Sequence, residues 1–228
     1  MRKIPMTNGL LYYLEEIEYT EAALLANEDT AVLGAAYTQA LAEWEGQFKA
    51  ERAARREVIR AEAVVAVRNE DLDAVTMTFA KTARGLAPEL LSKVFTIAPG
   101  RFIRTGLRAQ AERTLNVIVI EVGKIEPANP VFGFGKKLET LAHGALGALD
   151  LRTSAKGKSA TVGNDVDEWK EGINSLRLLT WTELLKIADA KGHPRSWADA
   201  FFRRTDERGA PSASEDPAPT PADPAPNA

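Results

Sequence analysis

Apolar residues recur every three or four positions through most of the chain. The spacing is clear at Leu10, Leu14 and Ile17, and again from Leu33 to Phe48. Residues three or four apart share one face of an α-helix, so the pattern predicts amphipathic helices. The polar segment 27–30 predicts a turn between the two stretches, because Asn is a favoured helix N-cap residue and acidic residues suit the first helical turn.

The segment from residue 30 to residue 85 has two interpretations. Residues 49–57 are strong helix formers without Gly or Pro, which allows one long helix. Gly46 instead allows a hairpin whose two arms bury each other's apolar faces. We favour the hairpin, because its arms would have similar lengths. Asn69-Glu70-Asp71 repeats the tripeptide at 27–29 and is interpreted as a second helix start rather than a duplication.

Gly and Pro residues divide the second half of the chain. A connector at 85–100 contains a short helical turn, and a helix is expected over 101–125, ending before Pro127. The centre of that helix, 115–122, is apolar on nearly every side, which predicts a helix covered all round.

Three further helices are predicted near the C-terminus. The first covers 136–151 and is rich in Gly and Ala, which permit a close approach by a neighbouring backbone. A polar loop at 153–163 separates it from a helix over 165–190, which ends at Gly192 and Pro194. A short helix is expected at 197–203.

The predicted fold class is therefore all-α. Residues 1–207 are expected to form an antiparallel helical bundle of five to six helices. Residues 208–228 are rich in Pro, Ala and Asp and contain no large apolar side chain, so they are expected to form a disordered tail.

Composition points to an ordinary globular protein. Of the 228 residues, 45% are hydrophobic, and the net charge of −3 argues against a strong general attraction to nucleic acid or anionic membranes. The longest apolar run, 115–122, is far shorter than the ~20 residues that span a bilayer. The absence of cysteine excludes disulfides and fits a cytoplasmic location.

Side chains with catalytic potential are scarce. The chain has no cysteine, and its histidines are His143 and His193. Gly157-Lys158-Ser159 matches the end of a P-loop, but Arg152 stands where the first glycine is required. Glu139 lies four residues before His143, without the further ligands that a metal site needs. We identify no family motif, and we expect no enzyme activity, no cofactor and no metal.

Four polar residues are expected to form an internal network. Asn116 and Glu121 interrupt the most apolar segment, and Asn174 and Arg177 lie beside the apolar seam of the 165–190 helix. Buried charges are normally paired, so we predict a Glu121–Arg177 or an Asn116–Asn174 contact. A small-ligand pocket using these groups is the alternative.

Two surfaces are candidates for interactions. Trp181 is offset from its helix seam and is expected to be exposed, while Trp197, Phe201, Phe202 and Arg203 would form a docking patch if they do not fold back. Separately, a basic stripe on one helix face comprises Lys49, Arg52, Arg56 and Arg60, and a second stripe comprises Arg101, Arg104 and Arg108. The stripes suit phosphate groups, although glutamates are interspersed and no aromatic residue lies within them.

Together these features favour a noncatalytic helical scaffold or a protein-interaction or assembly subunit. A protein partner or self-association is expected, and membrane and nucleic acid are the less favoured partners. The alternatives are a nucleic-acid-binding helical protein that uses the basic stripes, and a small-ligand-binding bundle.

Overall fold

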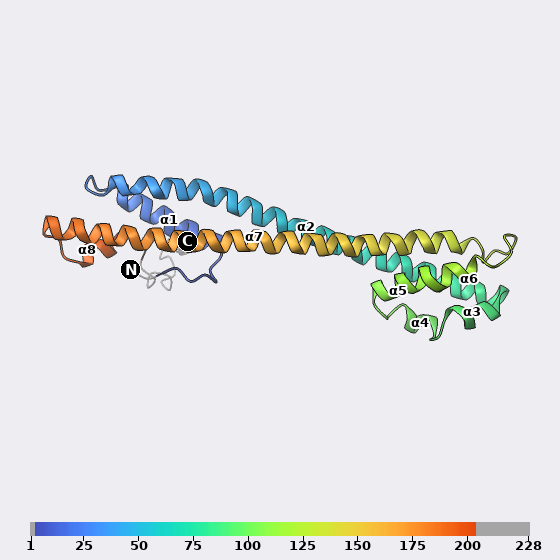
Figure 1. Cartoon of the computed structure of the whole chain (residues 1–228). Helices are drawn as coiled ribbons and strands as arrows, with labels where there is room; N and C mark the ends of the chain where they lie inside the picture. Colours follow the sequence, from blue (N-terminus) through green and yellow to red (C-terminus); the bar gives the residue numbers. More distant parts are fainter. Residues whose placement is uncertain (1–2, 204–228) are drawn as a thin grey trace, which may run out of the picture. The chain divides into compact units, whose positions relative to one another are not determined.

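A computed structural model describes residues 3–203 and shows helices joined by turns, with no strand among those residues (Figure 1). The predicted all-α fold is confirmed, whereas the predicted tail at 208–228 lies outside the described residues. The elements in chain order are α1 (Leu10–Leu25), α2 (Ala31–Leu86), α3 (Pro88–Val94), α4 (Pro99–Phe102), α5 (Leu107–Arg113), the π-helix η1 (Thr114–Val119), α6 (Ile120–Val122), α7 (Phe134–Lys191) and α8 (Ser196–Asp199).

The chain divides into two compact units. Among the described residues, unit 1 comprises 3–44 and 170–203, and unit 2 comprises 45–169. The helices α2 and α7 each continue from one unit into the other. The predicted single bundle domain over residues 1–207 stays a prediction.

Unit 1 is built on α1, the start of α2 and the end of α7. The predicted turn at 27–30 is confirmed, and the side chain of Asn27 accepts a hydrogen bond from the Asp29 amide at 2.9 Å. A Cβ at Gly34 would lie 2.9 Å from Cδ2 of Leu25, so glycine lets α2 approach α1 closely. The end of α7 is also as predicted, with Gly192 at a φ of 72°.

Unit 2 has a continuous apolar core. Side chains of α2, α7 and the short helices α3–α6 meet there, with Phe79, Phe95 and Phe102 among the large members. The Phe95 and Phe102 rings pack edge to face, with centroids 5.4 Å apart. The predicted helical turn in the connector is confirmed as α3.

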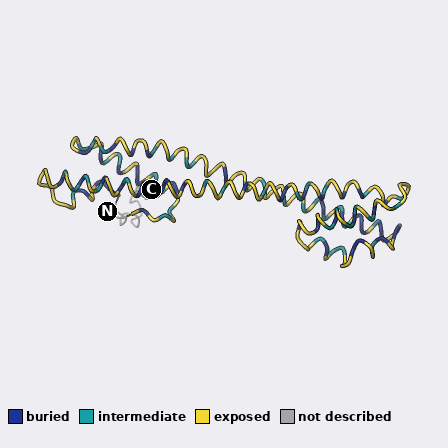
Figure 2. The backbone as a smooth tube through the Cα atoms, viewed as in Figure 1, coloured by how far each residue is buried: buried dark blue, intermediate teal, exposed yellow. Residues whose placement is uncertain are grey.

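The predicted hairpin at Gly46 is wrong, because α2 is one helix of 56 residues. From residue 49 to residue 71 Ala54 is the sole buried residue, so this stretch is largely exposed (Figure 2). Its helical form rests on the strong helix formers that it contains and on the absence of Pro. Asn69 likewise lies inside α2 rather than at a helix start.

The predicted loop at 153–163 is also wrong, since α7 runs unbroken through it. The segment has Gly157 and Gly163 but no Pro, and glycine costs a helix only about 1 kcal/mol. Ala155 is buried, and Lys156 and Lys158 form exposed ion pairs with Glu62 and Glu57 of α2 at 3.0 and 3.6 Å. These contacts hold a segment whose composition suggested a loop.

The expected helix over 101–125 is interrupted. Gly106 adopts a φ of 93°, which separates α4 from α5, and α5 leads into the π-helix η1. The segment 115–122 is not covered all round, because Asn116 is exposed and Ile120 is 53% exposed. Ile118 and Val122 carry its contact with the core of unit 2.

A substitution at Gly46 tests the continuity of α2. A Cβ at this position would meet no atom within 4 Å. We therefore expect Gly46→Ala to raise the free energy of unfolding by about 0.5–1 kcal/mol through helix propensity. Urea unfolding of the variant and the wild type measures the difference. A loss of stability would indicate a turn at this position instead.

Candidate functional site

A buried ion pair joins α1 to α7 in unit 1. The guanidinium Nη2 of Arg177 lies 3.3 Å from Oε2 of Glu16, and both side chains are almost fully buried. The Arg177 guanidinium also lies over the Phe202 ring, 5.0 Å from its centroid. Burial lowers the pKa of Arg177, and the Glu16 carboxylate acts in the opposite direction. The pair therefore offsets part of a large desolvation cost.

Asn174 fixes the N-terminal segment to α7. Its Oδ1 accepts a hydrogen bond from the Ile4 amide at 2.7 Å, and its Nδ2 donates to the Ile4 carbonyl at 2.9 Å. Lys170, one turn earlier on α7, donates to the carbonyl of Met6 at 3.0 Å. These bonds satisfy backbone groups of an irregular segment whose Ile4 side chain is buried.

The structure does not bring the four predicted network residues together. Asn174 and Arg177 lie in unit 1, with the partners described above, whereas Asn116 and Glu121 lie in unit 2. Asn116 is exposed, and Glu121 pairs with Lys124 three residues later. The buried carboxylate that Arg177 requires comes from Glu16 of α1. Glu16 was missed in the sequence because it stands between Glu15 and Glu18, and glutamates so close together in a helix are usually exposed to solvent.

The C-terminal aromatic residues fold back onto unit 1. Phe201 and Phe202 are buried, which removes them from the predicted docking patch. The Trp197 ring stacks on His193, and Arg203 forms an ion pair with Glu15 of α1. This patch is thus largely part of the core.

Trp181 is half-buried rather than exposed. Its indole Nε1 donates to the Asp199 carboxylate at 3.1 Å. The guanidinium of Arg195 lies over its ring, 5.4 Å from the centroid. Both groups follow α7 in the chain, so Trp181 anchors the segment around α8.

A second polar cluster, which was not predicted from the sequence, lies between α2 and α5 in unit 2. Nε2 of Gln110 donates to the Asp73 carboxylate at 2.8 Å, and burial raises the pKa of Asp73. Oε1 of Gln110 and the hydroxyls of Thr76 and Thr114 are buried and have no hydrogen-bond partner among the described residues 3–203. Thr114 begins the π-helix η1, and π-helical turns are frequent at functional sites.

An apolar groove opens between α2 and α7 in unit 2. It has a volume of about 590 Å³ and is lined by Val64, Arg68, Gly144, Gly147, Ala148, Asp150, Leu151 and Ser154. Val64, Leu151 and the nearby Val67 are 43%, 64% and 60% exposed. The inward face of the same α7 segment packs Ala142, Ala145 and Leu149 into the core. This segment of α7 therefore has apolar or small residues on two faces, one of which is uncovered.

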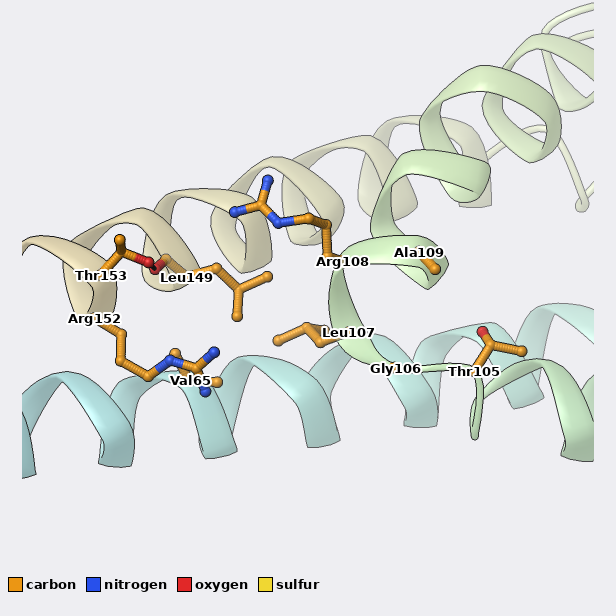
Figure 3. A pocket seen from close by; sticks show the side chains of 9 residues that line it. All are labelled: Val65, Thr105, Gly106, Leu107, Arg108, Ala109, Leu149, Arg152 and Thr153. Atoms are coloured by element: carbon orange, nitrogen blue, oxygen red, sulfur yellow. Dashed lines mark hydrogen bonds between the residues drawn. The ribbon is translucent and has the colours of Figure 1, made fainter. Parts of the chain in front are cut away.

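A separate pocket of about 480 Å³ lies near the start of α5. Leu107 and Leu149 point toward each other across it, with Val65 below them on α2 (Figure 3). Arg152 extends toward α2, and Arg108 turns away to pair with Asp150 at 2.9 Å. The pocket has an apolar floor and carries no cluster of groups suited to catalysis.

The two basic stripes differ in the structure. Lys49, Arg52, Arg56 and Arg60 are all exposed and lie on the continuous helix α2. In the second stripe, Arg101 belongs to α4, Arg104 to the following turn and Arg108 to α5. The first stripe is therefore a single helix face, whereas the second is divided.

Residues 3–203 contain no candidate metal site, P-loop or membrane-spanning helix. No three His, Asp or Glu side chains gather there as a metal site would require, and the P-loop-like residues 157–159 are helical. In the same range, no helix has the length and apolar character needed to cross a membrane. Comparison with protein families, curated proteins and solved structures finds no significant match.

The buried ion pair yields a prediction for unit 1. Arg177→Ala should destabilise the fold by about 3–5 kcal/mol, because it leaves the Glu16 carboxylate buried without this cation. Replacing both residues by apolar ones, as Glu16→Leu with Arg177→Met, should cost less. Urea unfolding measures both effects. Unchanged stability in Arg177→Ala would contradict the buried pair.

The polar cluster of unit 2 yields a prediction about protonation. Gln110→Ala should raise the pKa of Asp73 further, because the ionised carboxylate loses a hydrogen-bond donor. An NMR titration of the Asp73 carboxyl in both proteins measures this. A lower or unchanged pKa in the variant would show that the amide does not stabilise the carboxylate.

The raised pKa of Asp73 also links stability to pH. The folded state binds this proton more tightly than the unfolded chain does. The resulting stabilisation is fully present below the ordinary Asp pKa and is lost as pH rises through the folded value. In Asp73→Asn, this decrease in the free energy of unfolding with rising pH should disappear. Urea unfolding at several pH values measures it, and an unaltered pH dependence would contradict the linkage.

Proposed function

We propose that this protein is a noncatalytic interaction or assembly subunit whose α2–α7 groove in unit 2 accepts a helix of a protein partner. The observation that carries the proposal is the uncovered apolar surface of the groove, formed by the exposed side chains of Val64 and Leu151. Scattered exposed apolar residues are ordinary, but a contiguous apolar groove is typical of interaction sites.

The glycines of the groove support a close-packed partner. A Cβ at Gly147 would meet nothing within 4 Å, and one at Gly144 would meet only the Arg68 side chain, at 3.8 Å. No packing among residues 3–203 therefore calls for glycine at these positions, although each lowers helix propensity by about 1 kcal/mol relative to alanine. A partner backbone that lies against α7 would supply a reason for both.

The shape and chemistry of the groove suit an amphipathic helix. Two antiparallel helices form its walls, and apolar anchors spaced three or four residues apart on a third helix would fill it. Arg68 and Asp150 stand at the groove, where they form exposed ion pairs with Asp71 and Arg108 and place polar groups at its rim. Hydrophobic contacts at the centre and charges at the rim are the usual anatomy of an interface.

A side chain that fills the groove should prevent partner binding without lowering the stability of the fold. Gly147→Leu should raise the free energy of unfolding by about 0.5–1 kcal/mol through helix propensity, yet its side chain should block the partner helix. Gly157→Leu is the matched control: it is also exposed on α7, meets no atom within 4 Å and lies outside the groove.

Native mass spectrometry of the wild type and both variants, purified gently from the protein's own host, measures assembly. We expect a multiple of the chain mass or an added protein mass in the wild type and in Gly157→Leu, and its loss in Gly147→Leu. A monomeric wild type would contradict an assembly role. Assembly retained by Gly147→Leu would exclude this groove as the contact.

A further inference from the structure

The basic stripe of α2 lines a groove of its own. The groove has a volume of about 570 Å³ and is lined by Phe48, Lys49, Arg52, Ala53, Arg56, Glu57 and Arg60, all in unit 2. The four cations stand about one helical turn apart and extend over about 16 Å of the helix axis. They form a line of positive charge along a hollow rather than a scattered set of surface charges.

Within the part of the chain that the structure describes, these cations have no carboxylate partners. Among residues 3–203, none of the four forms an ion pair, whereas the nearby Glu57 and Glu62 pair with Lys158 and Lys156 of α7. Glu51 and Glu62 do not line the groove. The interspersed glutamates that argue against phosphate binding in the sequence are thus either neutralised or outside the groove.

We propose that this groove binds the phosphate backbone of double-stranded nucleic acid without sequence preference. Evenly spaced cations along a helix match a regular row of phosphates, and arginine binds phosphate oxygens through paired N–H groups. Phe48, at one end of the groove, is its single aromatic residue, so bases have no series of rings on which to stack. This feature favours a duplex over a single strand.

An anionic membrane surface fits the groove less well. A helix that lies on a bilayer buries an apolar face beside its cations, whereas the groove has Ala53 and Phe48 as its apolar members. The proposal is independent of the helix-binding groove at Val64 and Leu151, since the two grooves share no lining residue.

Salt dependence of binding tests the proposal. The probe is a short fluorescein-labelled DNA duplex of random sequence, and anisotropy with the full chain measures its affinity. Three to four phosphate contacts give a slope of log K against log salt of about −2.7 to −3.6. The affinity should then fall about 40- to 150-fold between about 50 and 200 mM salt.

A matched pair of variants locates the contact. The triple variant R52Q/R56Q/R60Q leaves Lys49 in the groove, so its slope should fall to about −1. The control K81Q/R84Q/K93Q removes the same charge from exposed positions of unit 2 that lie outside the groove and outside both basic stripes, and it should bind as the wild type does. Glutamine has a helix propensity close to that of arginine and lysine, and circular dichroism confirms that both variants fold.

Three outcomes would overturn the proposal. The first is no duplex binding by the wild type at about 50 mM salt, and the second is an equal loss in the two variants. The third is stripe-dependent binding to vesicles of anionic phospholipid in the absence of duplex binding, which would assign the groove to a membrane surface. A steep slope that is lost only in R52Q/R56Q/R60Q supports it.

Discussion

The structure depends on the continuity of two long helices, α2 and α7. The backbone N–H and C=O groups of a helix bond to one another within the helix. A helix can therefore continue through a stretch with few buried side chains, such as residues 49–71 of α2. Each helix contributes buried residues to both units. In α7 these residues include Leu138, Ala142, Ala145 and Leu149 in unit 2, and Asn174, Arg177, Thr180 and Leu184 in unit 1. The same helix therefore contributes an apolar face to one core and a partly polar face to the other.

The two cores are consequently specified in different ways. In unit 1 several buried polar groups are bonded to one another, as in the Glu16–Arg177 pair, the Asn174 contacts and the bond from the Tyr37 hydroxyl to Thr180, although Nε and Nη1 of Arg177 have no hydrogen-bond partner among residues 3–203. Such contacts disfavour other registers, because a shift would leave charged or amide groups buried without partners. Unit 2 relies on apolar packing and aromatic contacts, and its buried hydroxyls beside η1 are an exception within that core.

Sequence reasoning recovered the fold class and the elements with strong local signals. The turn at Asn27, the short helix α3 and the end of α7 at Gly192 all follow from residues that act locally. The hairpin at Gly46 and the loop at 153–163 were wrong, because a single glycine weakens a helix by only about 1 kcal/mol and neighbouring helix formers outweigh it. Arg177 was predicted to be a buried charge, but its partner Glu16 was missed because it stands between Glu15 and Glu18, although Tyr13 and Thr20 lie on the same buried face of α1. Gln110 and Thr114 were missed because polar residues near an interrupted helix carry no distinct pattern.

The way in which Asn174 holds Ile4 has a consequence for protein synthesis. Unit 2 is one uninterrupted stretch of chain, 45–169, whereas unit 1 combines the first 44 residues with those from 170 onward. Domains generally fold as units while the ribosome extends the chain. Residues 4–44 therefore leave the ribosome long before Asn174 and Arg177 are synthesised. The Glu16 carboxylate and the Ile4 backbone groups stay hydrated until nearly all of the described chain has been made. Unit 2 is free of this delay and can serve as the earlier folding nucleus.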